Sequence, residues 1–564
     1  MPAFFGLAAT AYAIASACGL ALTFDGSYYL FRALDSQQPV TPYERLINVP
    51  LQLPVLTVSS LTDDPRLLVP AFSLPYLLLP LVSLLACWWI VRDRQPRLFV
   101  WPVLGIGLVA LPAQPMPVSE SLMASQLTWP ILLAVLTGYR RRDWLLVVAF
   151  GSALALAHPL AVLLLAGLAT LAFVIWLARR GTAQGYLGWA AALAALALAA
   201  LLRTLLSFEL NADHLDEPFV TTYRAATAGN VRIMLVLAAA GCLSLLAGSA
   251  LRGRGAAAWA RRSEALAALL LLVAGIALVP WAADPHAWRR ALEYRQVVPV
   301  SAAFVMTLAL ADAWLLGALR RPAPAPPDTP IQGEPDGHRP VRSWIVVSQG
   351  AVLLAVLATC SLSWRGLTAQ LESAMGPGAA TCTSVESLDW ARNTPLDQWA
   401  VTSTSLIVQG RGPTRIVAPS CSVDFSPGLA IISSHGTYTP YDRTWFDLSG
   451  LAVLKPEPAA YFEVKIVSPY KAGEAHSVTV RVRDAEGGMA TGYRGTIHFT
   501  SSDPAAVLPP DYTFTLKDAG LHYFMYQAVL WTPGTQWLAA TDSSDPAITG
   551  RQDGIEVEQP PQAT

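Results

Sequence analysis

Charged side chains are scarce in this sequence. Asp, Glu, Lys and Arg account for 14% of its 564 residues, whereas soluble domains carry about 25%. The 38 basic and 39 acidic residues leave a net charge of −1, so the chain lacks the basic surplus with which nucleic-acid-binding proteins meet phosphate. We therefore expect no nucleic-acid partner.

The motifs of common soluble enzymes are missing too. The sequence contains no glycine-rich phosphate loop, no HExxH, no CxxC and no GxSxG, which argues against the enzyme classes that these motifs mark. Its His, Cys, Asp and Glu residues show no recognised metal-ligand spacing. We predict no metal-binding residues, and the need for a divalent metal cofactor stays open.

Cysteines number only six, and four of them lie within apolar runs. Cys382 and Cys421 are the two in the more polar C-terminal part of the chain. If that part lies outside the cytoplasm, the oxidising compartment favours a disulfide between them. We predict this disulfide.

Apolar residues, by contrast, make up 54% of the chain. A bilayer core about 30 Å thick needs about 20 apolar residues in a helix, and residues 1–362 provide about eleven such runs. Pro102, Pro112 and Pro130 interrupt some of them, which favours kinks, and Asp312 lies so deep in one run that it should face the bundle interior. The predicted fold class is a polytopic α-helical membrane protein. The runs are 2–23, 67–91, 98–112, 120–138, 144–157, 159–178, 186–206, 231–251, 264–282, 297–318 and 343–362.

Arginines fall in every second loop of this membrane domain. Because cytoplasmic loops carry the surplus of Lys and Arg, we predict a multi-pass protein of the cytoplasmic (inner) membrane. Its N-terminus is cytoplasmic and its C-terminus lies outside, and a flexible proline-rich linker at 321–342 is cytoplasmic. The basic loops hold Arg92, Arg94 and Arg97, then Arg140 to Arg142, Arg179 and Arg180, residues 252–262, and Arg320 and Arg321. The loops at 24–66, 113–119, 207–230 and 283–296 face outward.

The outer soluble part begins at residue 363. Within 363–457, strand-like runs at 399–408 and 415–418 are separated by Gly and Pro. This pattern indicates a small α/β or mostly β domain.

Residues 458–558 alternate between polar and apolar side chains in about seven short segments, a pattern typical of a β-sandwich. The run GYRGTIHFTSSD at 492–503, followed by DYTFT at 511–515, resembles the Ig-like repeats of bacterial surface proteins. The resemblance implies an Ig-like β-sandwich, which is a fold and not a function.

The first outer loop carries the most informative residues. It opens with FDGSYYLFRALD at 24–35, and a second amphipathic stretch follows at 42–61. An acidic residue at the membrane boundary, followed by short interfacial helices, resembles the GT-C superfamily of integral membrane glycosyltransferases, over residues 1–362. The resemblance implies that Asp25 is catalytic and that the sugar donor is a polyprenyl-phosphate lipid. Asp25 is equally suited to cap the helix that follows it, and the two roles are compatible.

Sugar transfer needs a carboxylate base for the acceptor and cations for the leaving phosphate. Three arginines in the outer loop 284–295 suit bidentate phosphate contacts, although a solvated helix or one that faces lipid head groups would also explain them. Glu120 either complements the dipole of its helix or is a second acid or metal ligand. His158, at a turn between two helices, is a candidate contact for the acceptor or phosphate. The predicted substrate-binding residues are Tyr29, Arg32, Glu44, Arg45, Glu120, His158, Arg289, Arg290 and Arg295.

We expect a hexosyltransferase that passes a sugar from a polyprenyl-linked donor in the membrane lipid to a glycan, lipid or protein acceptor on the outer side. The main alternative is a non-catalytic membrane scaffold or complex subunit that displays the Ig-like domain. An alanine at Asp25 separates the two, because only an enzyme would assemble and lose its function. A lipid or glycan transporter is less favoured, because membrane-embedded charges are few and no repeat of helices is visible.

Overall fold

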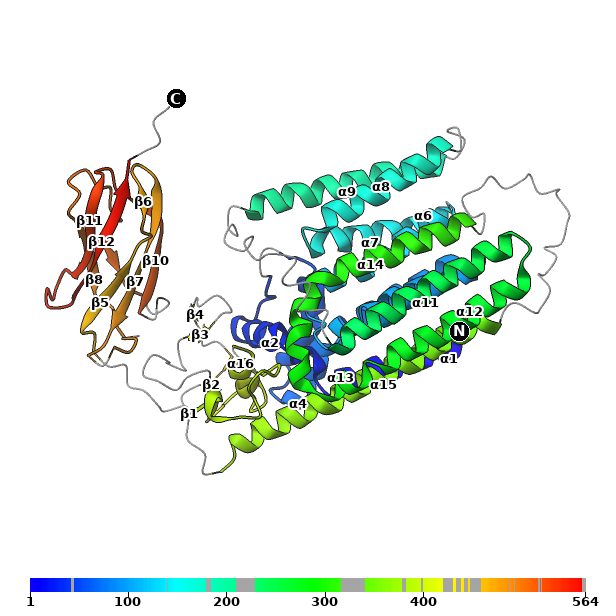
Figure 1. Cartoon of the computed structure of the whole chain (residues 1–564). Helices are drawn as coiled ribbons and strands as arrows, with labels where there is room; N and C mark the ends of the chain where they lie inside the picture. Colours follow the sequence, from blue (N-terminus) through cyan, green and yellow to red (C-terminus); the bar gives the residue numbers. More distant parts are fainter. Residues whose placement is uncertain are drawn as a thin grey trace. The chain divides into compact units, whose positions relative to one another are not determined.

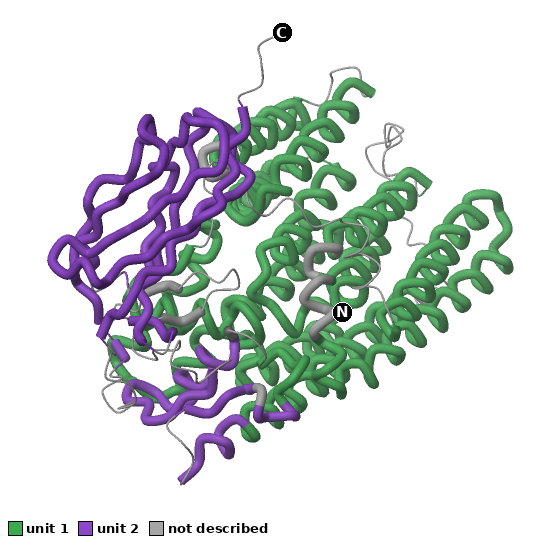
Figure 2. The backbone as a smooth tube through the Cα atoms, turned by 60° about the vertical axis from the view of Figure 1, so that its left-hand side comes forward, with its two compact units in different colours: residues 1–370, 391–396 green, residues 371–390, 397–564 purple. Residues whose placement is uncertain are grey.

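The computed structural model forms two compact units, which Figure 2 colours separately. Unit 1 comprises residues 1–370 and 391–396, and unit 2 comprises residues 371–390 and 397–564. The structure describes residues 1–41, 45–138, 140–178, 184–208, 229–315, 340–377, 382–396, 399–418, 430–432, 438–440, 445–446, 458–485, 487–490, 492–515, 518 and 520–559.

Unit 1 is a bundle of helices (Figure 1). Among the described residues, seven helical stretches are long and apolar enough to cross a membrane, which indicates a multi-pass membrane protein. Helices α8 and α9 pack together, as do α11 and α12. The seven stretches are α4 (Pro65–Val91), α8 (Ala161–Ala178), α9 (Gln184–Phe208), α11 (Gly229–Gly253), α12 with α13 (Ala257–Ile276 and Val279–Ala283), α14 (Arg289–Leu315) and α15 (Pro340–Ala374).

The predicted number of about eleven crossings stays a prediction. Helix α1 (Pro2–Ala17) has 16 residues and α7 (Trp144–Ala157) has 14, so each is shorter than a bilayer core requires. Helix α6 (Glu120–Thr137) has 18 residues but also contains buried polar side chains. The predicted run 98–112 is divided into several short helical pieces.

This divided run consists of η3 (Pro96–Phe99), α5 (Val100–Leu104), the π-helical turn η4 (Gly105–Val109) and η5 (Leu111–Ala113). Side chains from other helices bind the backbone and side chains of the irregular stretch. Tyr294 of α14 donates a hydrogen bond to the Val109 carbonyl at 2.7 Å, and Tyr12 of α1 donates one to Gln114 Oε1 at 2.9 Å. Irregular backbone is tolerated at membrane depth where protein groups satisfy it, and this stretch leads directly to Glu120.

Helix α15 extends beyond the predicted apolar run 343–362 at both ends. It begins at Pro340, so the last residues of the predicted linker 321–342 are helical, and proline is well suited to the first helical position. The helix continues to Ala374, twelve residues past the predicted end of the membrane domain at 362. Leu367 and Leu371 are buried, and this packing extends the helix. Residues 316–339 lie outside the described part of the chain.

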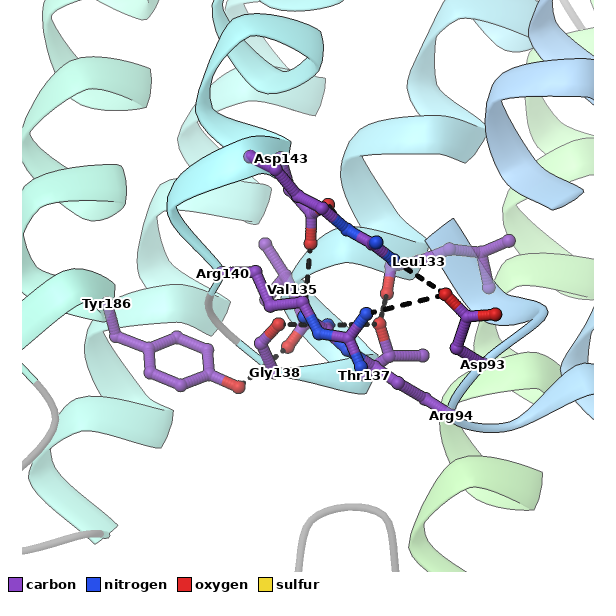
Figure 3. Close-up of polar contacts among 10 residues, drawn as sticks. Asp93, Arg94, Leu133, Val135, Thr137, Gly138, Arg140, Asp143 and Tyr186 are labelled. Atoms are coloured by element: carbon purple, nitrogen blue, oxygen red, sulfur yellow. Dashed lines mark hydrogen bonds and ion pairs between the residues drawn. The ribbon is translucent and has the colours of Figure 1, made fainter. Parts of the chain in front are cut away.

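Two of the described arginine-bearing loops meet at one end of α6. Figure 3 shows Arg94, which pairs with Asp143 at 3.2 Å and donates hydrogen bonds to Thr137 Oγ1 at 3.1 Å and to the Gly138 carbonyl. These contacts join the loop after α4 to the loop after α6. Helix α6 has 18 residues, so Glu120 at its first residue lies about 27 Å from this end.

Asp312 faces the bundle interior, as predicted. It is 0% exposed, pairs with Arg342 at 3.0 Å and accepts a hydrogen bond from the Trp101 indole at 2.8 Å. Arg342 also lies 3.5 Å from Glu264 and donates to the Arg97 carbonyl at 3.4 Å. A buried carboxylate is stable only with such partners, and here they join α12, α14 and α15.

The first part of unit 2 contains a helix where a strand was predicted. Residues 399–408 were expected as a strand, but α16 spans Trp399–Ile407. The β-branched and hydroxyl residues are tolerated because Thr404 donates a hydrogen bond to the Ala400 carbonyl one turn earlier at 2.7 Å. The predicted strand at 415–418 is confirmed as β2 (Ile416–Ala418), which pairs in parallel with β1 (Cys382–Ser384). Two further short strands, β3 (Ala430–Ile432) and β4 (Tyr438–Pro440), pair with each other.

The C-terminal region is rich in β-strands, which form two sheets. The strand orders are β10-β7-β5 and β6-β12-β11-β8-β9. In β7, Val478, Val480 and Val482 are 0% exposed and alternate with less buried residues, so the predicted alternation is confirmed there. Both sheets contribute to one apolar core. The strands are β5 (Tyr461–Lys465), β6 (Tyr470–Lys471), β7 (Ala475–Arg483), β8 (Thr496–Ser501), β9 (Tyr512–Thr513), β10 (Leu521–Val529), β11 (Gly534–Asp542) and β12 (Thr549–Glu558).

Candidate functional site

Helix α2 (Asp25–Ser36) begins at Asp25. Asp25 therefore occupies the first helical position, and the N-cap position predicted for it belongs to Phe24. Phe24 has φ 49° and ψ −119°, a positive φ that a residue with a bulky side chain rarely adopts. Backbone strain of this kind occurs preferentially at functional sites.

Gly26 explains why the backbone turns so sharply here. A Cβ atom at this position would lie 1.6 Å from the Ala21 carbonyl oxygen and 3.2 Å from Val118, so only glycine fits. The Thr23 hydroxyl donates a hydrogen bond to the Pro115 carbonyl at 2.5 Å. The start of α2 is therefore held against the segment that leads into Glu120.

Glu120 accepts hydrogen bonds from three side chains. Its Oε2 is 2.8 Å from Arg45 Nη1, and its Oε1 accepts from Asn48 Nδ2 at 3.0 Å and from the Tyr29 hydroxyl at 3.1 Å. The Glu120 side chain is 6% exposed, whereas that of Arg45 is 23% exposed. A carboxylate held in this way is suited to fix the guanidinium rather than to exchange a proton.

Behind these residues lies a second row of polar side chains from α3 (Asn48–Ser59) and α4. The Tyr76 hydroxyl donates to Asn48 Oδ1 at 3.0 Å and accepts from Gln52 Nε2 at 3.1 Å. Gln52 in turn binds the backbone N–H and carbonyl of Val40, at 2.7 and 3.1 Å. Asn48, Gln52 and Tyr76 are almost fully buried, so this row fixes the positions of Asn48 and, through it, Glu120.

His158 stands in the turn between α7 and α8, as predicted. Its Nδ1 accepts a hydrogen bond from the Leu160 N–H at 3.1 Å. Burial and then the charge of Arg45 lower the pKa of the imidazole to about 4, with Glu120 opposing the shift and Arg203 adding to it. The charges of Arg45 and Glu120 therefore reach His158, and the Ile47 N–H, which donates to the Leu156 carbonyl at 3.2 Å, joins the segment of Arg45 to that of His158.

Asp25 and Glu120 both act electrostatically on Tyr29. Burial raises the pKa of the Tyr29 hydroxyl well above its ordinary value, and the charges of Glu120 and Asp25 raise it further. Asp25, Tyr29 and Arg32 are spaced four and three residues apart, which puts them on one face of α2. Asp25 and Arg32 are both half-buried.

The structure therefore brings together Tyr29, Arg45, Glu120 and His158, with Asp25 close to Tyr29.

Glu44 lies outside the described residues, as does Cys421, so the disulfide with Cys382 stays a prediction. The described Cys18, Cys87, Cys242 and Cys360 are free thiols. Across the residues that the structure describes, no group of three His, Cys, Asp or Glu side chains could hold a metal ion.

The arginine-rich stretch 284–295 is largely helical rather than a loop. It comprises η8 (Pro285–Trp288) and the first two turns of α14. Arg289, Arg290 and Arg295 lie on this helix, and their side chains are outside the described residues. Tyr294 is buried and bound to the Val109 carbonyl, so these turns of α14 pack against the stretch that leads to Glu120.

The second row of the site was not predicted. Asn48 and Gln52 did carry a signal, because two amides four residues apart in an otherwise apolar stretch fall on one helical face. Tyr76 carried none, since a tyrosine in a long apolar run is unremarkable in a membrane helix. Its two partners, Asn48 and Gln52, both come from the preceding helix α3, and only the packing of α3 on α4 brings them to the tyrosine.

Comparisons with known proteins found no relative: no protein-family model, no curated protein and no solved structure matches the chain. The function is therefore inferred from the residues and their geometry.

Proposed function

We propose that this multi-pass protein is a GT-C-like glycosyltransferase that moves a sugar from a polyprenyl-phosphate lipid to an acceptor at the outer face of the cytoplasmic membrane. The observation that supports the proposal best is the Arg45–Glu120 pair, held by Tyr29 and Asn48 and lying beside Asp25 and His158. These residues come from segments far apart in the sequence. Such a polar group at the end of an apolar bundle suits a donor with a charged head and a lipid tail.

In the proposed reaction Asp25 is the general base. It takes the proton from the acceptor hydroxyl while that oxygen attacks the anomeric carbon of the sugar. The bond between this carbon and the phosphate oxygen breaks, and polyprenyl phosphate leaves with the electron pair. The negative charge that develops on the phosphate needs a fixed cation.

Arg45 is suited to supply that charge. Glu120 holds one edge of its guanidinium at 2.8 Å, while 23% of the side chain is exposed. A cation fixed by a buried carboxylate is pre-organised for a phosphate, because little side-chain entropy is lost on binding. Arg289, Arg290 and Arg295 of α14 are further candidates for the phosphate, and Arg32 is one for the sugar or acceptor.

The proposal includes the predicted topology of about eleven crossings. Residues 92–97 and 138–143 approach each other at one end of α6, and Glu120 lies at the other. The positive-inside rule supports a cytoplasmic position for these loops and therefore an outer position for Glu120. The C-terminal β region, proposed as an Ig-like domain, then lies outside, where a Cys382–Cys421 disulfide is stable.

A transfer assay with one matched pair of variants tests the proposal. Purified protein in lipid vesicles is given polyprenyl-phosphate hexoses labelled in the sugar, and release of the label from the lipid is measured. Asp25→Asn should lower the rate by about 100-fold or more, as expected on loss of a general base. The control is Asp63→Asn, at an exposed position between α3 and α4, which should behave as the wild type.

Two outcomes would contradict the enzyme proposal. One is equal transfer by wild type and Asp25→Asn, and the other is no transfer with any hexose donor. If the Asp25→Asn protein also assembles normally and supports growth or partner binding as the wild type does, the scaffold that displays the C-terminal β region replaces it.

A further inference from the structure

His158 is held in one tautomer by its own turn. The backbone N–H of Leu160 donates to Nδ1 at 3.1 Å, so this nitrogen carries a lone pair and no proton. In a neutral imidazole the proton then resides on Nε2. Protonation of Nδ1 would break the bond to Leu160 and leave its N–H facing another N–H group.

The charged groups around the ring also oppose a second proton. Arg45 and Arg203 are the cations that act on it, and Glu120 is the anion. Glu120 is already paired with Arg45 at 2.8 Å, and Arg203 is fixed nearby through its hydrogen bond to the Leu156 carbonyl at 3.1 Å. A protonated His158 would be a third cation around one carboxylate, in a half-buried place.

We propose that His158 is a neutral substrate-binding residue that donates a hydrogen bond from Nε2 to an oxygen of the lipid-linked sugar donor, either a sugar hydroxyl or a phosphate oxygen. The proposal rests on the proposed function. It assigns His158 a role different from that of Arg45. The neutral imidazole orients the donor through a directional hydrogen bond, whereas Arg45 supplies positive charge. It also leaves Asp25 as the base of the site.

The state of the ring is tested first, by titration of the whole protein. The eight histidines are labelled with carbon-13 and nitrogen-15, and the His158 signals are assigned by their loss in His158→Gln. We expect no titration of this ring between pH 5.5 and pH 8, whereas a free imidazole in solution, recorded as the reference, titrates near about pH 6.5. A His158 signal that titrates between pH 6 and pH 7 would overturn the proposal.

The donor role is tested by two variants in the transfer assay. The amide N–H of Gln reaches the position of Nε2, whereas the shorter Asn reaches only that of Nδ1. His158→Gln should retain activity within about threefold of wild type, and His158→Asn should lose about tenfold or more. Activity of His158→Gln should keep the wild-type pH profile between pH 5.5 and pH 8, because neither side chain titrates there.

The outcomes separate this proposal from the function on which it rests. If Asp25→Asn is inactive while His158→Asn transfers as fast as His158→Gln, the glycosyltransferase stands and the role of His158 fails. If wild type transfers no hexose, the enzyme proposal fails and the substrate role of His158 fails with it. In that case the titration still shows whether the His158 imidazole is neutral between pH 5.5 and pH 8.

Discussion

Replacing Glu120 by Gln would show whether the Arg45–Glu120 pair organises the site. Gln has nearly the same shape, and its oxygen can still accept from Tyr29 and Asn48. Its amide N–H₂ would face Arg45 Nη1, which now lies 2.8 Å from a carboxylate oxygen. The variant therefore removes the charge-assisted bond and leaves a half-buried guanidinium facing another donor.

The expected loss of stability follows from burial. Removing one partner of a fully buried ion pair costs about 3–5 kcal/mol. Because 23% of the Arg45 side chain is exposed, water offsets part of the loss, and about 2–4 kcal/mol is expected. In a unit of this size the melting temperature should fall by about 2–5 °C, as measured by tryptophan fluorescence in detergent. Asp553→Asn, which removes the exposed partner of Arg551, is the control for an exposed ion pair and should cost at most about 1 kcal/mol.

A double-mutant cycle completes this test. Arg45→Met should destabilise the protein as well, but Arg45→Met combined with Glu120→Gln should cost clearly less than the sum, because each change removes the same bond. Additivity to within about 0.5 kcal/mol would refute the coupling, as would an unchanged melting temperature for Glu120→Gln alone.

Other variants test the remaining parts of the account. Gly26→Ala should destabilise the start of α2 by about 1–3 kcal/mol through overpacking, because its Cβ would meet the Ala21 carbonyl, whereas Gly6→Ala, where nothing lies within 4 Å, should be neutral or stabilising; equal melting temperatures would contradict this. Non-reducing mass spectrometry of protein from the oxidising side should find Cys382 joined to Cys421, a loop worth roughly 3–4 kcal/mol, and free thiols at both positions would remove the disulfide. Asp503→Ala should lower the stability of the β region by about 2–4 kcal/mol, because Asp503 accepts hydrogen bonds from two backbone N–H groups at 2.5 and 2.9 Å after β10; wild-type hydrogen exchange in β10 and β11 would contradict it.

Parts of the fold with a simple periodicity could be predicted from the sequence. The apolar runs at 159–178 and 231–251 became α8 and α11, and the alternation from His476 became β7. The strand expected at 399–408 is helix α16. Its β-branched residues favour a strand, but packing of the segment on β2 outweighs this local preference. The division of the run 98–112 was not predictable in the same way: at Gly105, where the α-helix changes to a π-helical turn, a Cβ would be 2.4 Å from the Trp129 ring, a contact that no local pattern encodes.

The site was predictable to the extent that its residues stand out chemically. Glu120 and His158 are polar groups at the ends of apolar runs, and Tyr29 and Arg45 lie in the predicted outer loop 24–66, so sequence alone could select them. Their pairing depends on tertiary contacts between loops, and sequence could not assign Glu120 to Arg45. Of the two roles that the sequence suggested for Glu120, helix-dipole compensation fits the first residue of α6 but does not account for the three donors.

The most direct test of the central claim is to locate the lipid phosphate on the protein. A polyprenyl phosphate that carries a photoreactive diazirine next to the phosphate is cross-linked to the protein in membranes, and the adducts are mapped by mass spectrometry. The account predicts adducts in residues 24–61, in residues 114–129 or in the first turns of α14, and unlabelled polyprenyl phosphate should compete with them. Competable adducts confined to residues 92–97, residues 138–143 or the C-terminal β region would contradict it.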